Sequence, residues 1–361
     1  MALENIAIPD RETMIGDVGR LVEIESPSLD IAALSQSARE LASIMEQRLG
    51  SPATVVDCIA GPHVHWVGGG TPKVLIVGHH DTVFPKGALA ARPFTVDGDK
   101  ATGPGIFDMK AGIVQAIHGV AALADKSGVE ILITSDEEVG SVHSRDLIVE
   151  RAKACGAVLV LEPSADGGAL KTARKGTGTF ELHVLGRASH AGLEPEKGVN
   201  ALVEASAQIL LINTFGNAEL GTTVTPTVAV VGTADNVVPA LAKISIDVRV
   251  VEAVERERVD ALMNSLTVEN PEARLEIKGG FNRPPMPPTA STWLFPMAVE
   301  VAREIGLPDI EGVAVGGGSD GNFTAAAGVA TLDGLGAVGG LSLIHISEPT
   351  DRQKSRMPSS A

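Results

Sequence analysis

The sequence predicts an α/β protein, in which a mostly parallel sheet flanked by helices carries an inserted, ferredoxin-like α+β domain. In the first half of the chain, short apolar runs bounded by turn residues alternate with helical stretches. This alternation is typical of a parallel sheet covered on both faces. From about residue 175 the order becomes strand, helix, strand, strand, helix, strand, which is that of a ferredoxin-like unit.

The predicted elements follow in chain order. Residues 11–49 contain two helical patterns, in which apolar side chains recur three and four residues apart. Parallel strands are predicted at 74–77, 131–133 and 157–161, with helices between them at 111–124 and 144–154.

The inserted unit is predicted from strands at 179–185, 223–231, 243–250 and 273–277 and from helices at 199–212 and 253–266. A proline-rich stretch at 284–288 ends this unit. A helix at 293–305 and a strand at 313–315 then return the chain to the first domain. We therefore expect the first domain to comprise residues 1–174 and 284–340, and the inserted domain to comprise residues 175–283.

Composition and charge exclude several function classes. The 361 residues include 29 Lys and Arg against 45 Asp and Glu, a net charge of −16, which disfavours nucleic acid and anionic membranes as partners. No window approaches the roughly 18 apolar residues of a transmembrane helix, and the N-terminus lacks the pattern of a secretory signal. The two cysteines form no disulfide framework. We expect a cytoplasmic protein that acts on a small molecule or peptide.

Each predicted parallel strand runs directly into side chains of the kind that bind metals. Residues 78–81 (Gly-His-His-Asp) follow the first strand, residues 136–138 (Asp-Glu-Glu) follow the second, and Glu162 follows the third. Ligands bind at the carboxyl ends of strands in open α/β sheets, so these side chains should converge. A glycine-rich loop at 103–108 delivers a further carboxylate, Asp108. One imidazole among several carboxylates suits Zn²⁺ or a similar divalent ion.

Five motifs together resemble the M20 family of co-catalytic zinc peptidases, and within it the glutamate carboxypeptidases. They are GHHDTV at 78–83, GPGIFDMK at 103–110, DEEVGS at 136–141, EPS at 162–164 and ASHAG at 188–192. The resemblance covers roughly residues 10–340. It implies a zinc-peptidase catalytic domain, an inserted dimerisation (lid) domain and a homodimer.

The resemblance also implies a role for each motif residue. His79 and Glu162 bind one zinc, Asp108 bridges two zincs, and Glu138 binds the second, which makes two Zn²⁺ per subunit, with Co²⁺ or Mn²⁺ as alternatives. Two further carboxylates take part without binding zinc. Asp81 orients the imidazole of His79, and Glu137 is the general base that activates water.

Further motif residues are implied to bind the substrate. His190 resembles the histidine that reaches the partner subunit's site and stabilises the oxyanion. Asn236 and Arg249 resemble the residues that hold a free carboxylate, and Gly318 and Ser319 belong to a glycine-rich substrate loop. The implied reaction is hydrolysis of an amide bond next to a free carboxylate, which releases C-terminal glutamate or a similar amino acid from a small peptide or an N-acyl amino acid.

A serine hydrolase is the rival from another chemical class. Residues 317–321 satisfy the G-x-S-x-G pattern, and Asp333 and His345 follow Ser319 in the order of an α/β-hydrolase triad. This alternative leaves the carboxylates at the strand ends unexplained. A chelator should abolish activity if the metal interpretation holds, and a serine-directed acylating reagent if the rival holds.

The tail departs from the family pattern, which requires a Gly-Ala-His or similar segment after residue 338 to complete the second zinc site, and then a closing segment. The chain instead reads GGLSLIHISEPT at 339–350, and 341–350 resembles translated sequencing-adapter read-through. We therefore expect residues 341–361 to be non-native, the second zinc site to be weakened and the chain to be impaired in catalysis, or to act only in binding. His345, about two positions late, is the one substitute for the missing ligand.

Overall fold

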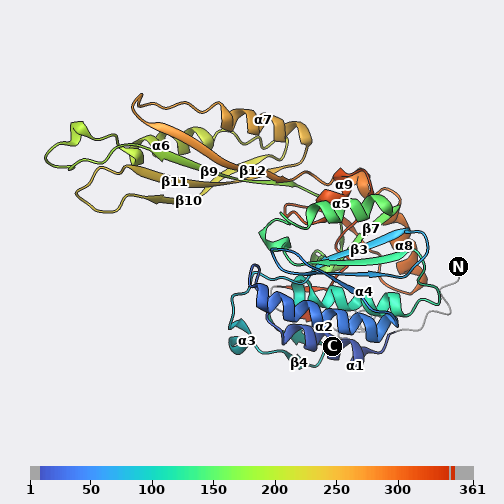
Figure 1. Cartoon of the computed structure of the whole chain (residues 1–361). Helices are drawn as coiled ribbons and strands as arrows, with labels where there is room; N and C mark the ends of the chain where they lie inside the picture. Colours follow the sequence, from blue (N-terminus) through green and yellow to red (C-terminus); the bar gives the residue numbers. More distant parts are fainter. Residues whose placement is uncertain (1–8, 341–342, 346–361) are drawn as a thin grey trace, which may run out of the picture. The chain divides into compact units, whose positions relative to one another are not determined.

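The computed structural model describes residues 9–340 and 343–345, which fold into two compact units (Figure 1). Unit 1 contains the described residues up to Ala173, then Pro288–Val315, and those from Ser319 onward. Unit 2 contains Arg174–Pro287 and Gly316–Gly318. Unit 1 is built on a mixed, mostly parallel sheet and unit 2 on a separate antiparallel sheet, so the predicted fold class is confirmed.

The main sheet of unit 1 has the strand order β1-β2-β6-β3-β7-β14. Its strands are β1 (Thr54–Val56), β2 (His63–Val67), β3 (Val74–His79), β6 (Val129–Thr134), β7 (Ala157–Val160) and β14 (Ala330–Leu332). Strand β3 is parallel to β6 on one side and to β7 on the other, and β14 is parallel to β7. Strands β1 and β2 form an antiparallel hairpin on the β6 side. The carboxyl ends of β3, β6 and β7 therefore lie next to one another.

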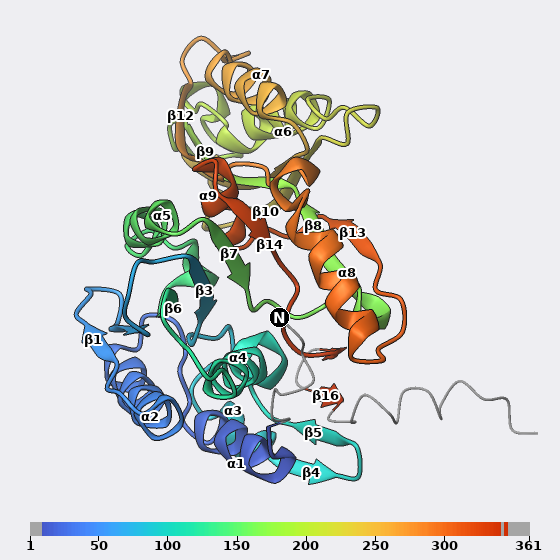
Figure 2. The ribbon, with the colours of Figure 1, turned by 90° about the vertical axis from the view of Figure 1, so that its right-hand side faces the viewer.

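Helices cover both faces of this sheet (Figure 2). Ile76 of β3 packs in a core with helices α1 (Arg11–Val22), α2 (Ile31–Leu49) and α4 (Ala111–Ala121). Its neighbours Leu75 and Val77 pack on the other face with α5 (Arg145–Ala154), as the alternation of side chains along a strand requires. Helix α9 (Gly321–Ala326) packs beside α5 in this second layer. Helix α8 (Leu294–Glu304) lies on the face of Ile76 instead, where Leu294 packs with Ala157 and Leu332. Within the described part of the chain, none of the helices combines the length and the hydropathy needed to cross a membrane.

Most of the smaller elements of unit 1 escaped the sequence analysis. The exception is β13 (Gly312–Val315), where a strand was predicted at 313–315. A second sheet has the order β15-β16-β5-β4, and β13 pairs with β8. Their bounds are β4 (Thr95–Asp97), β5 (Lys100–Thr102), β8 (Leu170–Arg174), β13 (Gly312–Val315), β15 (Gly339–Gly340) and β16 (Leu343–His345), with a short helix α3 (Ala88–Ala91). Strand β16 belongs to the segment 341–361 that was predicted to be foreign. The rest of that segment lies outside the described residues.

Unit 2 has the predicted order of elements, β9 (Gly176–Leu185), α6 (Ala201–Ile212), β10 (Thr223–Val231), β11 (Leu241–Val250), α7 (Ala253–Asn264) and β12 (Arg274–Arg283). The strands pair antiparallel in the order β10-β11-β9-β12, and both helices lie on one face of the sheet (Figure 1). Phe180, Leu182 and Val184 alternate along β9 and face this helical layer, where they form the core with Ala205 and Val259.

A buried ionic network joins the helices on one face of unit 1. The carboxylate of Asp17 is 1% exposed. It accepts hydrogen bonds from Arg48 Nε at 2.7 Å, His118 Nε2 at 2.8 Å and Arg20 Nη1 at 3.1 Å. Burial raises the pKa of Asp17, but the hydrogen bonds from Arg48 and His118 outweigh burial and hold the pKa below its ordinary value.

The folded state prefers the ionised form of Asp17. The network therefore stabilises the protein fully at pH values above the pKa that Asp17 has in the unfolded chain. This stabilisation is lost as the pH falls through the lower pKa that Asp17 has in the folded state. We predict that Asp17→Asn lowers the free energy of unfolding by about 2 kcal/mol at pH 7, and that the deficit shrinks at about pH 3. Urea unfolding at both pH values measures it. A deficit of equal size at both would contradict the prediction.

Candidate metal and catalytic site

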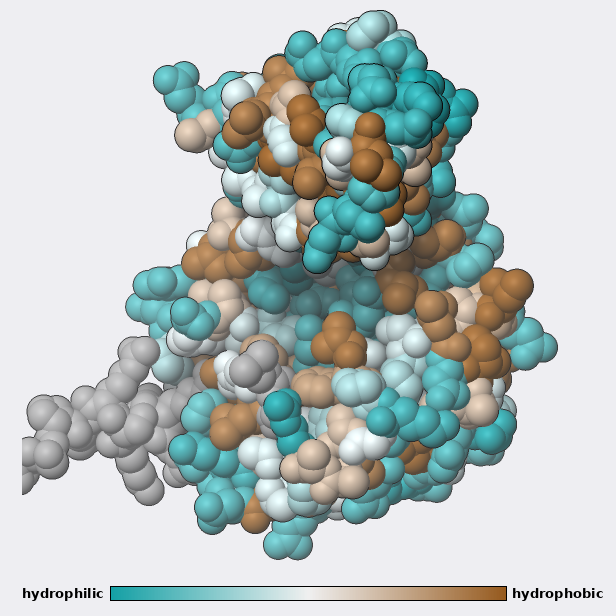
Figure 3. All heavy atoms as spheres, turned by 90° about the vertical axis from the view of Figure 1, so that its left-hand side faces the viewer, coloured by the Kyte–Doolittle hydropathy of each residue, from teal (hydrophilic) through white to brown (hydrophobic). Residues whose placement is uncertain are grey.

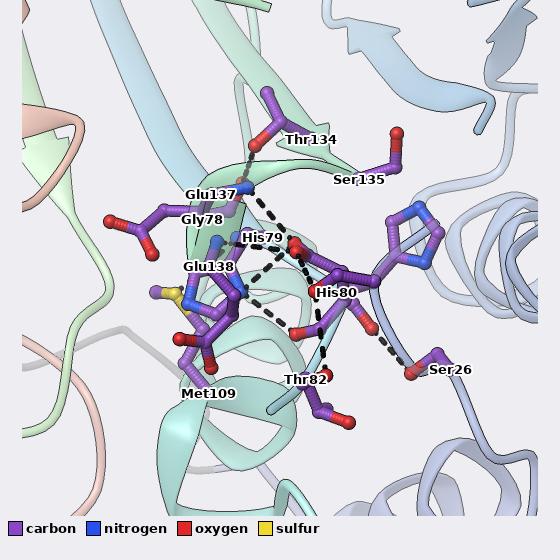
Figure 4. Close-up of polar contacts among 12 residues, drawn as sticks. Ser26, Gly78, His79, His80, Thr82, Met109, Thr134, Ser135, Glu137 and Glu138 are labelled. Carbon is purple, nitrogen blue, oxygen red and sulfur yellow. Dashed lines mark hydrogen bonds and ion pairs between the residues drawn. The ribbon is translucent and has the colours of Figure 1, made fainter. Parts of the chain in front are cut away.

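The ends of the three central parallel strands bring the predicted metal ligands together. Figure 4 shows His79, Glu137 and Glu138 at two of these ends. His79 is the last residue of β3. Glu137 and Glu138 begin a single 3₁₀ turn (Glu137–Val139) that follows the end of β6. Glu162 lies two residues beyond the end of β7. His79 Nε2 lies 3.7 Å from Glu162 Oε1, although 83 positions of sequence separate the two residues.

Asp108 reaches the same place from an irregular loop rather than from a strand. It lies in a short helical turn (Ile106–Lys110) whose backbone leaves helical geometry at Asp108 and Met109. The loop enters through Gly105 at a φ of 69°, where a Cβ would lie 2.4 Å from Thr82 Cγ2, so only glycine fits. Asp108 Oδ1 thereby lies 3.2 Å from His79 Nε2, and the carboxylate stays 43% exposed.

The buried carboxylate of Asp81 connects the ligands from behind. Its Oδ1 lies 3.3 Å from His79 Nδ1, and its backbone carbonyl lies 3.0 Å from the same nitrogen. The backbone N–H groups of Glu137 and Glu138 donate to its two oxygens, each at 3.2 Å, and Ser28 Oγ donates at 2.7 Å. One carboxylate therefore fixes both the ring of His79, with Nε2 directed at the other carboxylates, and the turn that carries the two glutamates.

The donor set fits a divalent metal ion. Two overlapping groups have ligand atoms within 4.8 Å of one another: His79, Asp108 and Glu138 form one, and His79, Glu137 and Glu162 form the other. Imidazole nitrogen and carboxylate oxygen are the donors that Zn²⁺, Mn²⁺ and Co²⁺ accept. The residues fit such an ion because they place several negative charges around one imidazole in a largely buried site.

The protonation equilibria of the site reflect this excess of negative charge. Burial lowers the pKa of His79, but hydrogen bonds to Asp108 and Asp81 and the charge of Glu137 outweigh burial and raise the pKa well above its ordinary value. Burial raises the pKa of Glu138 to about 7; the charge of His79 opposes this effect and the charges of Asp108 and Asp81 add to it. A bound cation would lower both pKa values, because it favours a neutral imidazole and an ionised carboxylate.

His80 stays out of the cluster although it is adjacent to His79. Its ring points away from the carboxylates (Figure 4), with Nδ1 3.0 Å from Ser37 Oγ and Nε2 3.0 Å from the carbonyl of Pro62. Burial lowers the pKa of His80 to about 4. His80 is therefore a neutral structural residue, whose two ring nitrogens are both satisfied.

The predicted substrate residues His190, Asn236 and Arg249 lie in unit 2. The backbone pairs residues 190 and 237, and Ala191 N–H donates to Asn236 O at 2.9 Å, so His190 and Asn236 come from neighbouring segments. Arg249 lies on β11, and its guanidinium binds the carboxylate of Asp247 through Nη2 at 2.7 Å and Nε at 2.9 Å. The fork expected to hold a substrate carboxylate therefore holds Asp247.

Two buried arginines at the glycine loop were missed by the sequence analysis. Arg174 is 4% exposed and Arg283 is 9% exposed. Arg174 Nη1 donates to the carbonyls of Gly317 at 3.0 Å and Gly318 at 3.2 Å. A Cβ at Gly318 would lie 2.9 Å from Arg283 Cδ, so glycine is required there. The run of three glycines was the only signal in the sequence, because neither arginine lies in a motif.

Ser319 is not arranged as a nucleophile. It is fully buried, and its Oγ donates directly to Asp333 Oδ2 at 2.6 Å, so no histidine stands between the two as a triad requires. His345 is exposed in β16, opposite Lys100 of β5. Among the described residues, no hydrogen bond joins His345 to Ser319 or Asp333. The geometry thus speaks against the serine-hydrolase alternative.

Comparisons of sequence agree with the metal-binding geometry. Residues 75–352 match the sequence model of peptidase family M20/M25/M40. Carboxypeptidase G2 of Pseudomonas sp. (strain RS-16) is 33% identical over 352 residues, covering 92% of this chain and 83% of that protein. Succinyl-diaminopimelate desuccinylase of Dinoroseobacter shibae is 28% identical over 253 residues, covering 63% of this chain and 67% of that protein.

Solved structures share the fold. Aminopeptidase PepT from Bacillus cereus superposes with a TM-score of 0.72 at 20% identity and covers 96% of each chain. The M20 family metallo-carboxypeptidase Sso-CP2 from Sulfolobus solfataricus superposes with a TM-score of 0.70 at 15% identity, covering 94% of this chain and 95% of that one.

We predict that chelator-treated protein binds added Zn²⁺ and that Asp108→Asn weakens this binding by about tenfold or more, because the amide removes a negatively charged donor from the cluster. Calorimetric titration with Zn²⁺ measures both affinities. Asp309→Asn is the matched control, since its side chain is 85% exposed and pairs with Arg303 instead. Equal affinity in the two variants would exclude Asp108 as a ligand.

Proposed function

Because this chain belongs to peptidase family M20/M25/M40, we propose that it hydrolyses an amide bond next to a free carboxylate, releasing C-terminal glutamate or a similar amino acid from a small peptide or N-acyl amino acid. The observation that carries this proposal is the set of acidic side chains around His79 at the ends of adjacent parallel strands. The likeness to carboxypeptidase G2 across 92% of the chain supports the choice of substrate class.

We propose that the site holds two Zn²⁺, with Co²⁺ or Mn²⁺ as substitutes. His79 and Glu162 would bind one ion, Asp108 would bridge both, and Glu138 would bind the other. Such ions polarise the scissile carbonyl and acidify a bound water. Support comes from the donor atoms gathered within 4.8 Å and from the hydrogen bond of Asp81 to His79, which directs Nε2 at the cluster. The first ion then has three candidate ligands and the second has two, Asp108 and Glu138. His345 would have to supply the third ligand of the second ion, in place of the histidine that the family pattern has there.

Glu137 is proposed as the general base. Its side chain is 9% exposed and lies beside His79 and Glu162, and Asp81 holds its backbone. In this role the carboxylate takes a proton from the attacking water and passes it to the leaving amine. Adjacent residues on an irregular turn can direct one carboxylate at the water and the next at the metal, which is the division proposed for Glu137 and Glu138.

We predict that Glu137→Gln lowers kcat by a factor of about 10² to 10⁴ and leaves the zinc content unchanged, because the amide keeps the size of the side chain but cannot accept the proton. Hydrolysis of a panel of N-acyl amino acids, with zinc quantified in the same preparations, tests both halves. Loss of zinc in this variant would instead indicate that Glu137 is a metal ligand. Its position beside His79 and Glu162 also allows this role. Wild-type protein that hydrolyses no member of the panel would refute the proposed function.

Substrate contacts are proposed from unit 2 and the glycine loop. Asn236 and Arg249 would hold the free carboxylate, Gly318 and Ser319 would line the substrate, and His190 would stabilise the oxyanion in the partner's site. Since Asp247 occupies Nε and Nη2 of Arg249, a substrate carboxylate would either displace Asp247 or bind the N–H donors that Asp247 does not use. The ion pair between Arg249 and Asp247 therefore lowers the affinity of Arg249 for a substrate carboxylate.

We propose a homodimer through unit 2, because the role proposed for His190 places its side chain in the site of a partner subunit. Strand β10 is at the edge of its sheet, where among the described residues it pairs only with β11. Val228 and Val230 on this strand are 55% and 64% exposed, and Leu210 on α6 is 73% exposed. Hydrophobic side chains also reach the surface of unit 2 on the face drawn in Figure 3. An unpaired edge with apolar side chains is suited to antiparallel pairing with its own copy.

We predict that the wild-type protein is a dimer and that Val230→Lys makes it monomeric, because the introduced charge would be buried at the paired edge. Light scattering during gel filtration gives the mass. Val254→Lys on α7 is the control, since Val254 is 59% exposed but lies on another element. A monomeric wild type, or a dimeric Val230→Lys variant, would argue against this interface.

A further inference from the structure

Both ends of the segment that carries Glu137 and Glu138 are bound to one carboxylate, that of Asp320. Thr134, the last residue of β6, precedes the segment, and Ser141 ends it. Ser141 Oγ donates to Asp320 Oδ1, and Thr134 Oγ1 lies 3.3 Å from Asp320 Oδ2. The hydroxyl of Thr134 is shared with the carbonyl of Gly78 at 3.4 Å, directly before His79. Asp320 comes from a part of the chain 179 positions after Ser141.

The Ser141 end of the segment has a backbone that needs support from its surroundings. Ser141 has a φ of +53°, a left-handed conformation that a residue with a side chain keeps only when its environment holds it. Its N–H donates to Asp136 O at 2.7 Å, and the preceding Gly140 N–H donates to Glu137 O at 2.8 Å. The hydroxyl bond to Asp320 is the side-chain contact that completes this turn.

These contacts are excluded from water. Asp320 is 2% exposed, and Thr134 and Ser141 are fully buried. Hydrogen bonds to a charged acceptor are short and strong in such surroundings. The position of Asp320 relative to the segment is therefore well defined, as the placement of reacting groups requires.

We propose that Asp320 is a positioning residue for hydrolysis, which holds the segment 135–140 so that Glu137 faces the attacking water and Glu138 faces the metal. This inference rests on the proposed function. Asp81 binds the middle of the segment through the N–H groups of Glu137 and Glu138, and Asp320 binds its two ends. The catalytic turn is thus held by two buried carboxylates from different parts of the chain.

The test compares Asp320→Asn with Asp17→Asn in the zinc-loaded full chain. Both variants make the same change at a nearly fully buried carboxylate of unit 1, but the network of Asp17 lies among α1, α2 and α4. We expect Asp320→Asn to lower kcat by about tenfold or more while KM stays within about twofold. Asp17→Asn should lose stability and keep its kcat. Equal values of kcat in the two variants would overturn the proposal.

Ser141→Ala provides a second variant, which removes a single hydroxyl. We expect kcat to fall in the same direction by a smaller factor. In the double variant, the loss should be smaller than the product of the two single losses, because both substitutions act on the same hydrogen bond: one removes its donor and the other the charge of its acceptor. Independent, multiplicative losses would show that Asp320 does not act through Ser141 and would contradict the proposal.

Amide hydrogen exchange separates this inference from the proposed function. Asp320→Asn should raise exchange at residues 136–141 more than Asp17→Asn does, whether or not a substrate has been found. If the wild type hydrolyses no acyl amino acid, the proposed function fails and the exchange result still decides whether Asp320 holds the segment. Unchanged exchange in that segment would overturn the positioning role even in an active enzyme.

Discussion

The hydrogen bonds to the buried carboxylate of Asp81 are the constraint on which the site depends. This one side chain accepts from both backbone N–H groups of the Glu137–Glu138 turn and lies within 3.3 Å of His79 Nδ1. A charge with no exposure to water must be fully compensated. Burial raises the pKa of Asp81, but the hydrogen bond and the charge of His79 outweigh burial and hold the pKa below its ordinary value. The carboxylate therefore stays ionised, and two neighbouring strands keep a fixed relation at their ends.

The parts of the fold that the sequence could predict are those that bury a continuous apolar face. Strands β3, β6 and β7 are nearly wholly apolar, and β10 was predicted with the bounds that it has. The short strands β4, β5 and β16 were missed, because three residues carry no periodicity and their pairing depends on distant partners. The convergence of His79, Glu138 and Glu162 was predictable from strand order, since adjacent parallel strands end at the same edge.

Other features of the site depend on contacts that no local pattern records. Asp247 and Arg249 are two residues apart and therefore share a face of β11, but the sequence does not reveal that the two side chains bind each other. Nor does it distinguish a serine nucleophile from Ser319, which is buried as the donor to Asp333. Arg174 and Asp320 lie far in sequence from the groups they bind. Such residues are found through tertiary structure, and several of them hold the catalytic loops in place.

We propose that the carboxylates around His79 form a metal centre, and that the hydrogen bonds accepted by Asp81 and Asp320 keep its ligands in register. Anomalous diffraction at the zinc edge, from crystals of the zinc-loaded protein, tests it most directly. We predict zinc density bounded by His79 Nε2 and the carboxylates of Asp108, Glu138 and Glu162. Ordered zinc only at other side chains, with His79 Nε2 still beside Asp108 Oδ1 and no metal between them, would contradict this assignment.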